Sequence, residues 1–118
     1  MSTFNHERIW MDINALRSAR VSLEDAHNHA LCRETWGNKL IENQLLLVKF
    51  FEMALLFETC HSLMENVVQG FRLVSASDVE FGTCTAILKV QAARTLEKVN
   101  REAQQVFGGL GYSRWRRW

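Results

Sequence analysis

The chain has 118 residues, of which 47% are hydrophobic and 23% charged, so its size and composition fit one globular domain and exclude a disordered or collagen-like chain. Its 14 Lys and Arg against 13 Asp and Glu leave a net charge of +1. This charge is too small to attract a polyanion over a distance, so we expect no nucleic-acid partner. The chain contains no proline. Because proline interrupts helices, its absence predicts long, continuous helices.

The cysteines and histidines argue against a disulfide framework and against a metal site. Cys32, Cys60 and Cys84 form no C-x-x-C pair, and His27 and His29 face nearly opposite sides of a helix. The first ten residues contain no apolar core of a signal peptide, and the densest apolar stretch is too short to span a membrane. We therefore expect an intracellular protein, cytoplasmic or in a mitochondrion or peroxisome, with no transmembrane segment.

An amphipathic pattern opens the chain. The apolar residues Ile9, Leu16, Leu23 and Ala30 recur at intervals of seven, which predicts one long helix over residues 4–31.

A second helix is expected after a turn at Gly37. It should begin near Asn38 and stop near Gly70. Its apolar residues, such as Phe51 and Leu55, lie on so many faces that we expect it to be buried against more than one neighbour.

The third helix is predicted from a capping box, Ser77-Asp78-Val79-Glu80, to the glycines at 108–111. Three antiparallel helices joined by short links indicate an all-α, up-and-down bundle over residues 1–112. Residues 113–118 change composition abruptly and are expected to form an irregular basic and aromatic tail.

Three motifs, taken in order, resemble the C-terminal helical domain of the acyl-CoA dehydrogenases from Phe4 to Tyr112. They are Phe4-Asn5-His6-Glu7-Arg8, Arg33-Glu34-Thr35-Trp36-Gly37 followed by Gln44, and Gln105-Val106-Phe107-Gly108-Gly109-Leu110-Gly111-Tyr112. Each motif alone has a plainer interpretation, such as a surface ion pair or a helix stop. The resemblance implies that the three helices correspond to three of the four helices in the bundle of that family. We do not expect the fourth helix in this sequence.

The resemblance implies FAD-dependent oxidation of an acyl-CoA thioester to the enoyl-CoA. In one branch of the family, a glutamate at the start of the first helix removes the α proton while hydride leaves the β carbon for the flavin. Glu7 occupies that place, and Arg8 would line the substrate pocket. Other members carry the glutamate on a loop beyond the Gly-Gly-x-Gly-Tyr segment, so the position of the ancestral base stays open.

The resemblance also implies two groups of contacts with an FAD held by the neighbouring subunit. Arg33, Thr35, Trp36 and Gln44 would reach its pyrophosphate and adenosine end, where the planar fork of arginine suits phosphate oxygens. The second group lies along the same FAD across the dimer interface and consists of Gln105, Val106, Phe107, Gly108 and Gly109. Trp36 departs from the phenylalanine that is more usual there.

The partners implied are an acyl-CoA substrate and either further copies of the chain or a full-length relative. The family builds its flavin and acyl pocket from additional domains, so we expect the chain to be inactive alone. The alternative hypothesis is a non-catalytic helical module for oligomerisation or interaction, derived from the same family.

Overall fold

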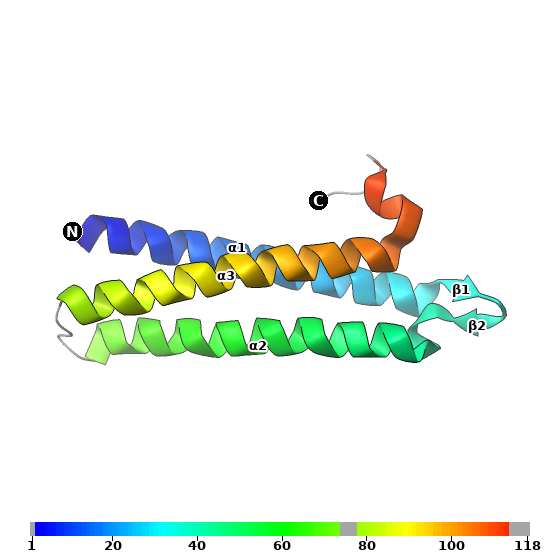
Figure 1. The fold of residues 1–118 in the computed structure, drawn as a ribbon, viewed down its shortest axis with the longest axis horizontal. Helices are drawn as coiled ribbons and strands as arrows, with labels where there is room; N and C mark the ends of the chain where they lie inside the picture. Colours follow the sequence, from blue (N-terminus) through cyan, green and yellow to red (C-terminus); the bar gives the residue numbers. More distant parts are fainter. Residues whose placement is uncertain (1, 74–77, 114–118) are drawn as a thin grey trace.

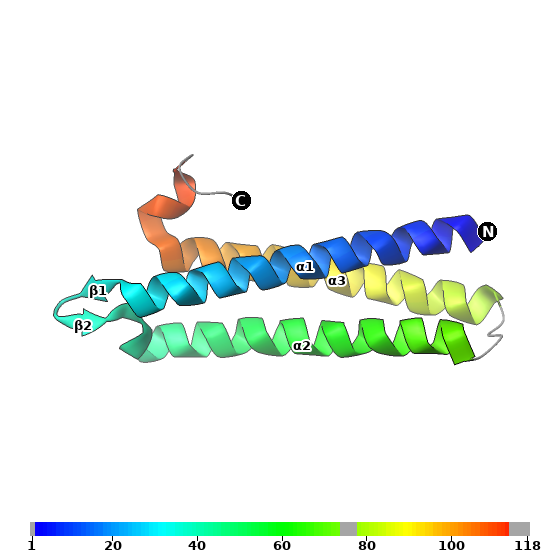
Figure 2. The ribbon, with the colours of Figure 1, turned by 180° about the vertical axis from the view of Figure 1, so that it is seen from behind.

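The computed structural model describes residues 2–73 and 78–113, which form an elongated bundle of 58 × 28 × 17 Å (Figure 1). Its long helices are α1, Ser2–Cys32, α2, Gln44–Leu73, and α3, Asp78–Phe107. α1 and α3 run in the same direction and α2 runs against both, as both views show (Figures 1 and 2). The predicted all-α, up-and-down bundle is confirmed.

A short β-hairpin joins α1 to α2. Its strands are β1, Glu34–Thr35, and β2, Asn38–Lys39, and the 3-10 helix η1, Leu40–Glu42, follows. The two turn residues, Trp36 and Gly37, have φ angles of 56° and 83°. Positive φ at both central residues is the requirement of the tight turn that suits a two-residue hairpin, so the predicted turn at Gly37 is confirmed.

The predicted ends of the second helix are wrong at both sides. Asn38 is paired in β2, and α2 is started instead by Asn43, whose Oδ1 accepts a 3.0 Å hydrogen bond from the backbone N–H of Leu45. This is an N-cap, which satisfies a helix donor that otherwise has no partner. Gly70 lies inside α2, which continues to Leu73, because a single glycine costs a helix only about 1 kcal/mol.

The predicted end of α3 is confirmed. The helix stops at Phe107, and Gly108 takes a φ of +60°, the left-handed conformation that glycine adopts without a steric penalty. The 3-10 helix η2, Gly108–Tyr112, then turns the chain away from the bundle (Figure 1). The capping serine, Ser77, and the tail residues 114–118 lie outside the described residues.

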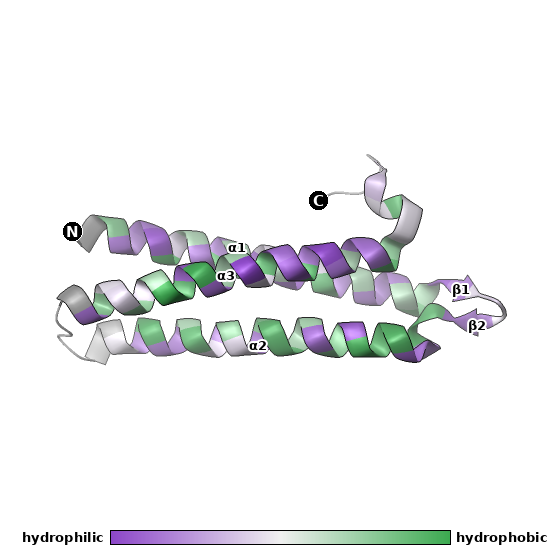
Figure 3. Ribbon diagram, viewed as in Figure 1, coloured by the Kyte–Doolittle hydropathy of each residue, from purple (hydrophilic) through white to green (hydrophobic). Residues whose placement is uncertain are grey.

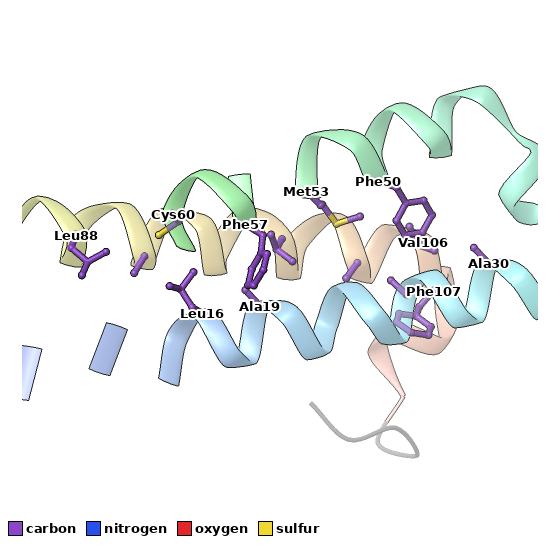
Figure 4. Packing of buried hydrophobic residues seen from close by; sticks show 14 of the residues in the cluster. Leu16, Ala19, Ala30, Phe50, Met53, Phe57, Cys60, Leu88, Val106 and Phe107 are labelled. Carbon is purple, nitrogen blue, oxygen red and sulfur yellow. The ribbon is translucent and has the colours of Figure 1, made fainter. Parts of the chain in front are cut away.

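The core lies where the three helices meet, and small side chains let α1 and α3 approach closely. Ala19 and Ala26 on α1 and Ala92 and Ala103 on α3 are completely buried. Larger side chains fill the space toward α2 (Figure 4). The larger buried side chains are Leu16, Phe50, Met53, Phe57, Cys60, Val67, Leu88, Val99, Val106 and Phe107.

α2 packs against both other helices, as its apolar pattern predicts, yet part of its apolar surface stays exposed. Hydrophobic colouring recurs along the helix in Figure 3. The exposed apolar side chains in its first half are Leu45, Leu47, Val48, Phe51 and Leu55, which we call the α2 apolar face. Single exposed apolar residues are ordinary, whereas a group of five on one helix is an unusually large exposed apolar surface.

Candidate functional site

The hairpin end of the bundle carries the first of the predicted cofactor residues, Arg33. It follows α1 directly, its N–H donates to the His29 carbonyl at 2.9 Å, and its carbonyl accepts from the Leu40 N–H at 2.8 Å. These two bonds fix the backbone, while the guanidinium is exposed. Within residues 2–73 and 78–113, no carboxylate lies within ion-pair distance of it, so the charge is available to a ligand.

Trp36 stands at the tip of the hairpin, and its side chain is fully exposed at 102%. A bulky residue at a positive φ is rare, because its Cβ crowds the backbone. Beside it lies a polar hollow lined by Thr35, Asn38, Lys39 and Glu42. The fold thus presents an indole to the surroundings at a conformational cost, a pattern that often accompanies a binding role.

The segment 105–109 lies at the same end of the bundle. The Phe107 ring contacts the ring of His29, one turn before Arg33, with centroids 4.7 Å apart. The side chains of Val106 and Phe107 are buried in the core, so a ligand can reach these two residues only through their backbone. The parts of this segment open to a ligand are Gln105, Gly108 and Gly109, and Gln44 at the start of α2 is also exposed.

Glu7 and Arg8 lie at the opposite end. Both side chains are exposed, and they sit in the second turn of α1, because the helix begins at Ser2. From Glu7 to the end of α1 at Cys32 the helix rises roughly 38 Å. The structure therefore brings the predicted cofactor residues together and keeps the predicted base and its arginine neighbour far from them.

The described part of the chain holds no group of three or more His, Cys, Asp and Glu side chains that could bind a metal. His27 contacts the Phe50 ring of α2 and His29 the Phe107 ring of α3, as expected of side chains on different faces. No described helix combines the length and the hydropathy that a membrane span needs.

One buried acid was not predicted from the sequence. Asp12 is fully buried on the face of α1 that also carries Leu16 and Ala19. The signal was present, since a charged residue one turn before Leu16 interrupts an otherwise apolar stripe.

The comparisons with known proteins identify the family. The family model described as "Acyl-CoA dehydrogenase, C-terminal domain" matches residues 1–118. The chain belongs to the acyl-CoA dehydrogenase family. It is 38% identical over 118 residues to Acyl-CoA dehydrogenase AFT10-1 of Alternaria alternata, and the match covers 97% of this chain and 27% of that protein.

Solved structures agree with this assignment. A probable acyl-CoA dehydrogenase from Mycobacterium abscessus matches with a TM-score of 0.88 and 31% identity, over 98% of this chain and 30% of that one. Butyryl-CoA dehydrogenase from Megasphaera elsdenii matches with a TM-score of 0.87 and 29% identity, over 96% and 28%. The chain is thus an acyl-CoA dehydrogenase C-terminal domain and spans between a quarter and a third of the length of these relatives.

The acyl-CoA dehydrogenase family is FAD-dependent, and its members act on acyl-CoA and are typically oligomers. The residues at the hairpin end fit such a cofactor. An exposed arginine with no carboxylate partner in the described residues suits a pyrophosphate, and an exposed indole suits contact with a flat ring system.

Proposed function

We propose that this domain takes part in the FAD-dependent α,β-dehydrogenation of an acyl-CoA thioester, and that it does so as one part of a larger enzyme. The observation that carries the proposal is the match of the acyl-CoA dehydrogenase C-terminal domain to residues 1–118, which cover only 27% of the Alternaria relative. Catalysis by this domain alone is not expected, because Glu7 is open to solvent, whereas a base that removes a weakly acidic α proton needs a desolvated carboxylate.

In the proposed reaction Glu7 accepts the α proton of the acyl chain. Arg8, the next residue, would line the same pocket and hold the substrate in place. Other domains of the enzyme would cover both residues and exclude water. Hydrogen bonds to the thioester carbonyl, also from outside this domain, would stabilise the enolate character that develops as the proton leaves. The base belongs to this domain, and much of the pocket does not.

At the other end, the hairpin and the start of α2 would bind FAD. Arg33 would pair with the pyrophosphate, Trp36 and Thr35 would contact the adenosine part, and Gln44 would add a hydrogen bond. Gln105 and the backbone from Val106 to Gly109, including that of Phe107 and Gly108, would lie along the same cofactor. When bound, FAD supplies the acceptor for the hydride that leaves the β carbon.

The distance along α1 supports two different sites for the two groups of residues. Roughly 38 Å separates the ends, which is more than one compact site spans. We therefore propose that Glu7 serves the substrate of its own subunit, and that the hairpin end contacts the FAD of a neighbouring copy. This makes the enzyme an obligate oligomer.

A chimaera tests the catalytic role. This domain replaces its counterpart in the Alternaria relative, and anaerobic loss of flavin absorbance on adding acyl-CoA is followed. Glu7→Gln should slow flavin reduction by about 10²- to 10⁴-fold without loss of bound FAD. Glu24→Gln, which removes an exposed acid from the same helix, is the matched control and should reduce at the normal rate. Flavin reduction at the full rate in the Glu7→Gln chimaera would contradict the assignment of Glu7 as the base.

Mixed oligomers test the sharing of FAD between copies. A copy with Glu7→Gln and a copy with Arg33→Ala are each expected to be impaired alone. In a dimer that contains one of each, one site carries both defects and the other carries neither. Co-expression should therefore recover activity. If both residues served the same copy, every site would keep one defect and no activity would return.

The second candidate is a helical module for oligomerisation, and the α2 apolar face is the observation that favours it. Light scattering on the purified 118-residue chain separates the cases. A stable oligomer that Phe51→Glu dissociates supports this function, and a monomer with little dye-accessible apolar surface contradicts it. Glu58→Gln, an exposed change further along α2, is the control.

We propose an intracellular location. The three cysteines are free, and Cys32 and Cys84 are exposed, which suits a reducing compartment. Fractionation of cells that express the tagged protein tests this.

A further inference from the structure

Asp12 carries a buried carboxylate that has few polar or charged partners to stabilise its ionised form. Its side chain is 1% exposed, and neither oxygen has a hydrogen-bond partner within the described residues. The positive charge that faces it is the Nζ of Lys89 on α3, 3.8 Å from Oδ1, which is beyond hydrogen-bond distance. An ionised carboxylate in such a place is costly unless it is paired and hydrogen-bonded.

The other groups around Asp12 come from all three helices. Cys60 on α2 is buried, and burial raises the pKa of its thiol. The Thr95 hydroxyl on α3 opposes that rise in the thiol pKa, whereas the negative charge of Asp12 adds to it. Asp12, Cys60 and Thr95 are therefore close enough to influence one another electrostatically. Arg8, one turn earlier on α1, is exposed. Lys89 is thus the only cation in this cluster on the helices packed against Asp12, among the described residues.

We propose that Asp12 is a proton-binding site in the core that couples the first third of α1 to α3. Its neutral acid form needs no counter-charge, whereas its ionised form depends on Lys89. The Lys89 Nζ also lies 3.4 Å from the Met11 sulfur. The lysine therefore contacts α1 three residues after Arg8. Gain or loss of one proton, exchanged with solvent, therefore changes how tightly this part of α1 is held.

The direction of the pH effect follows from the surroundings. Burial raises the pKa of Asp12 above its ordinary value of 3.8, and the charge of Lys89 opposes the rise. A group with a raised pKa binds more protons in the folded than in the unfolded state. The free energy of unfolding therefore decreases as pH rises from 3.8 through the folded pKa. Asp12 favours the fold in mild acid and weakens it near neutral pH.

A carbon NMR titration of the full 118-residue chain measures the site directly. The Asp12 carboxyl signal should titrate with a midpoint above 3.8. Lys89→Met should move this midpoint higher, because it removes the positive charge that opposes the rise in the Asp12 pKa. Lys39→Met, an exposed lysine on β2, is the control and should leave it in place. A midpoint at or below 3.8 in the wild-type chain overturns the proposal.

Unfolding by urea across pH tests the link to stability. Asp12→Asn should be more stable than the wild-type chain at neutral pH, and the difference should shrink as the pH falls toward 3.8. Asp25→Asn, an exposed change on the same helix, controls for the loss of one charge. Parallel profiles for the wild type and Asp12→Asn would overturn the proposal. If Asp12→Asn fails to fold, the NMR titration of the wild type still decides.

Hydrogen exchange tests the coupling to α1. In Lys89→Met, the amides of residues 5–12 should lose protection near neutral pH and regain it in mild acid, where Asp12 needs no counter-charge. Equal protection in Lys89→Met and wild type at both pH values would contradict the coupling.

Discussion

The Ser22 hydroxyl donates a 2.6 Å hydrogen bond to Oδ1 of Asn100 and so joins α1 to α3 across 78 positions of sequence. The Ser22 side chain is buried and Asn100 is half-buried, so water replaces this bond poorly. The bond lies within an apolar interface that includes the buried alanines Ala19 and Ala26, and it specifies how α1 and α3 are aligned.

Ser22→Ala should destabilise the chain by about 1–2 kcal/mol, because it leaves a partly buried amide oxygen without a partner. Urea unfolding measures the loss. Ser18→Ala is the matched control on the same helix, since Ser18 is exposed and bonds only to the Asn14 carbonyl one turn earlier. Equal effects of the two changes would contradict a special role for Ser22.

Leu88→Ala should cost about 2–5 kcal/mol, because the side chain is completely buried between the helices and its removal leaves a cavity. Its neighbour Ile87 is 56% exposed, and Ile87→Ala should cost less than about 1 kcal/mol. Thermal unfolding of the two variants compares adjacent positions of one helix. A larger loss at Ile87 would mean that the faces of α3 are assigned the wrong way round.

Glu102 should give a pH dependence opposite to that of Asp12. Its carboxylate accepts hydrogen bonds from Lys49 at 2.6 Å and Lys98 at 3.1 Å. The bond from Lys49 is the main reason that the pKa of Glu102 lies below its ordinary 4.5, with burial opposing and Lys98 contributing. A lowered pKa stabilises the fold above pH 4.5, and this contribution is lost as the pH falls through the folded pKa.

Glu102→Gln should therefore lose about 1 kcal/mol near neutral pH, a modest value because both lysine ends are partly exposed. The loss should fade in acid, as urea unfolding at several pH values can show. Glu97→Gln breaks the exposed pair with Arg101 and should cost at most about 0.5 kcal/mol. A constant loss for Glu102→Gln at every pH would contradict the assignment.

Trp36→Asn should stabilise the chain by about 0.5–1 kcal/mol, because asparagine tolerates the left-handed conformation that tryptophan adopts there at a cost. In the chimaeric enzyme the same change should weaken FAD binding, as measured by flavin release. Trp10→Asn replaces an exposed tryptophan within α1 and should give neither gain nor weaker binding. A loss of stability in Trp36→Asn would contradict this prediction, because it would mean that the indole stabilises the folded chain.

The helices could be predicted from the sequence because their apolar residues repeat with a period that only a helix satisfies, and because glycine marks the end of α3 at Gly108. The hairpin could not be predicted. Its strands have two residues each, too few for alternation to show, and its turn contains a tryptophan where asparagine or glycine is usual. Asn43 was a readable signal for the start of α2, but Asn38 offered the same residue type closer to Gly37.

The sequence motifs nominate a set of candidate site residues, and that set stays a prediction, but the motifs did not reveal how those residues are arranged. Motif order assigns Glu7 and Arg33 to one family, yet only the continuous helix between them shows that they lie at opposite ends. The burial of Val106 and Phe107 was also hidden, since the motif does not distinguish side chains that contact a ligand from those that hold the backbone. The only sign of the buried Asp12 in the sequence was a charged residue that interrupts an apolar stripe.

The length of α1 has a mechanical consequence. A helix of 31 residues without proline is a continuous rod roughly 46 Å long. A tilt of about 5° about its C-terminal end would move Glu7 by about 3 Å. In the role proposed for Glu7, a displacement of about 1 Å would already lower the rate strongly. The position of Glu7 depends on the contacts that hold the N-terminal part of α1 against α3, and the contact between Met11 and Lys89 is one of them.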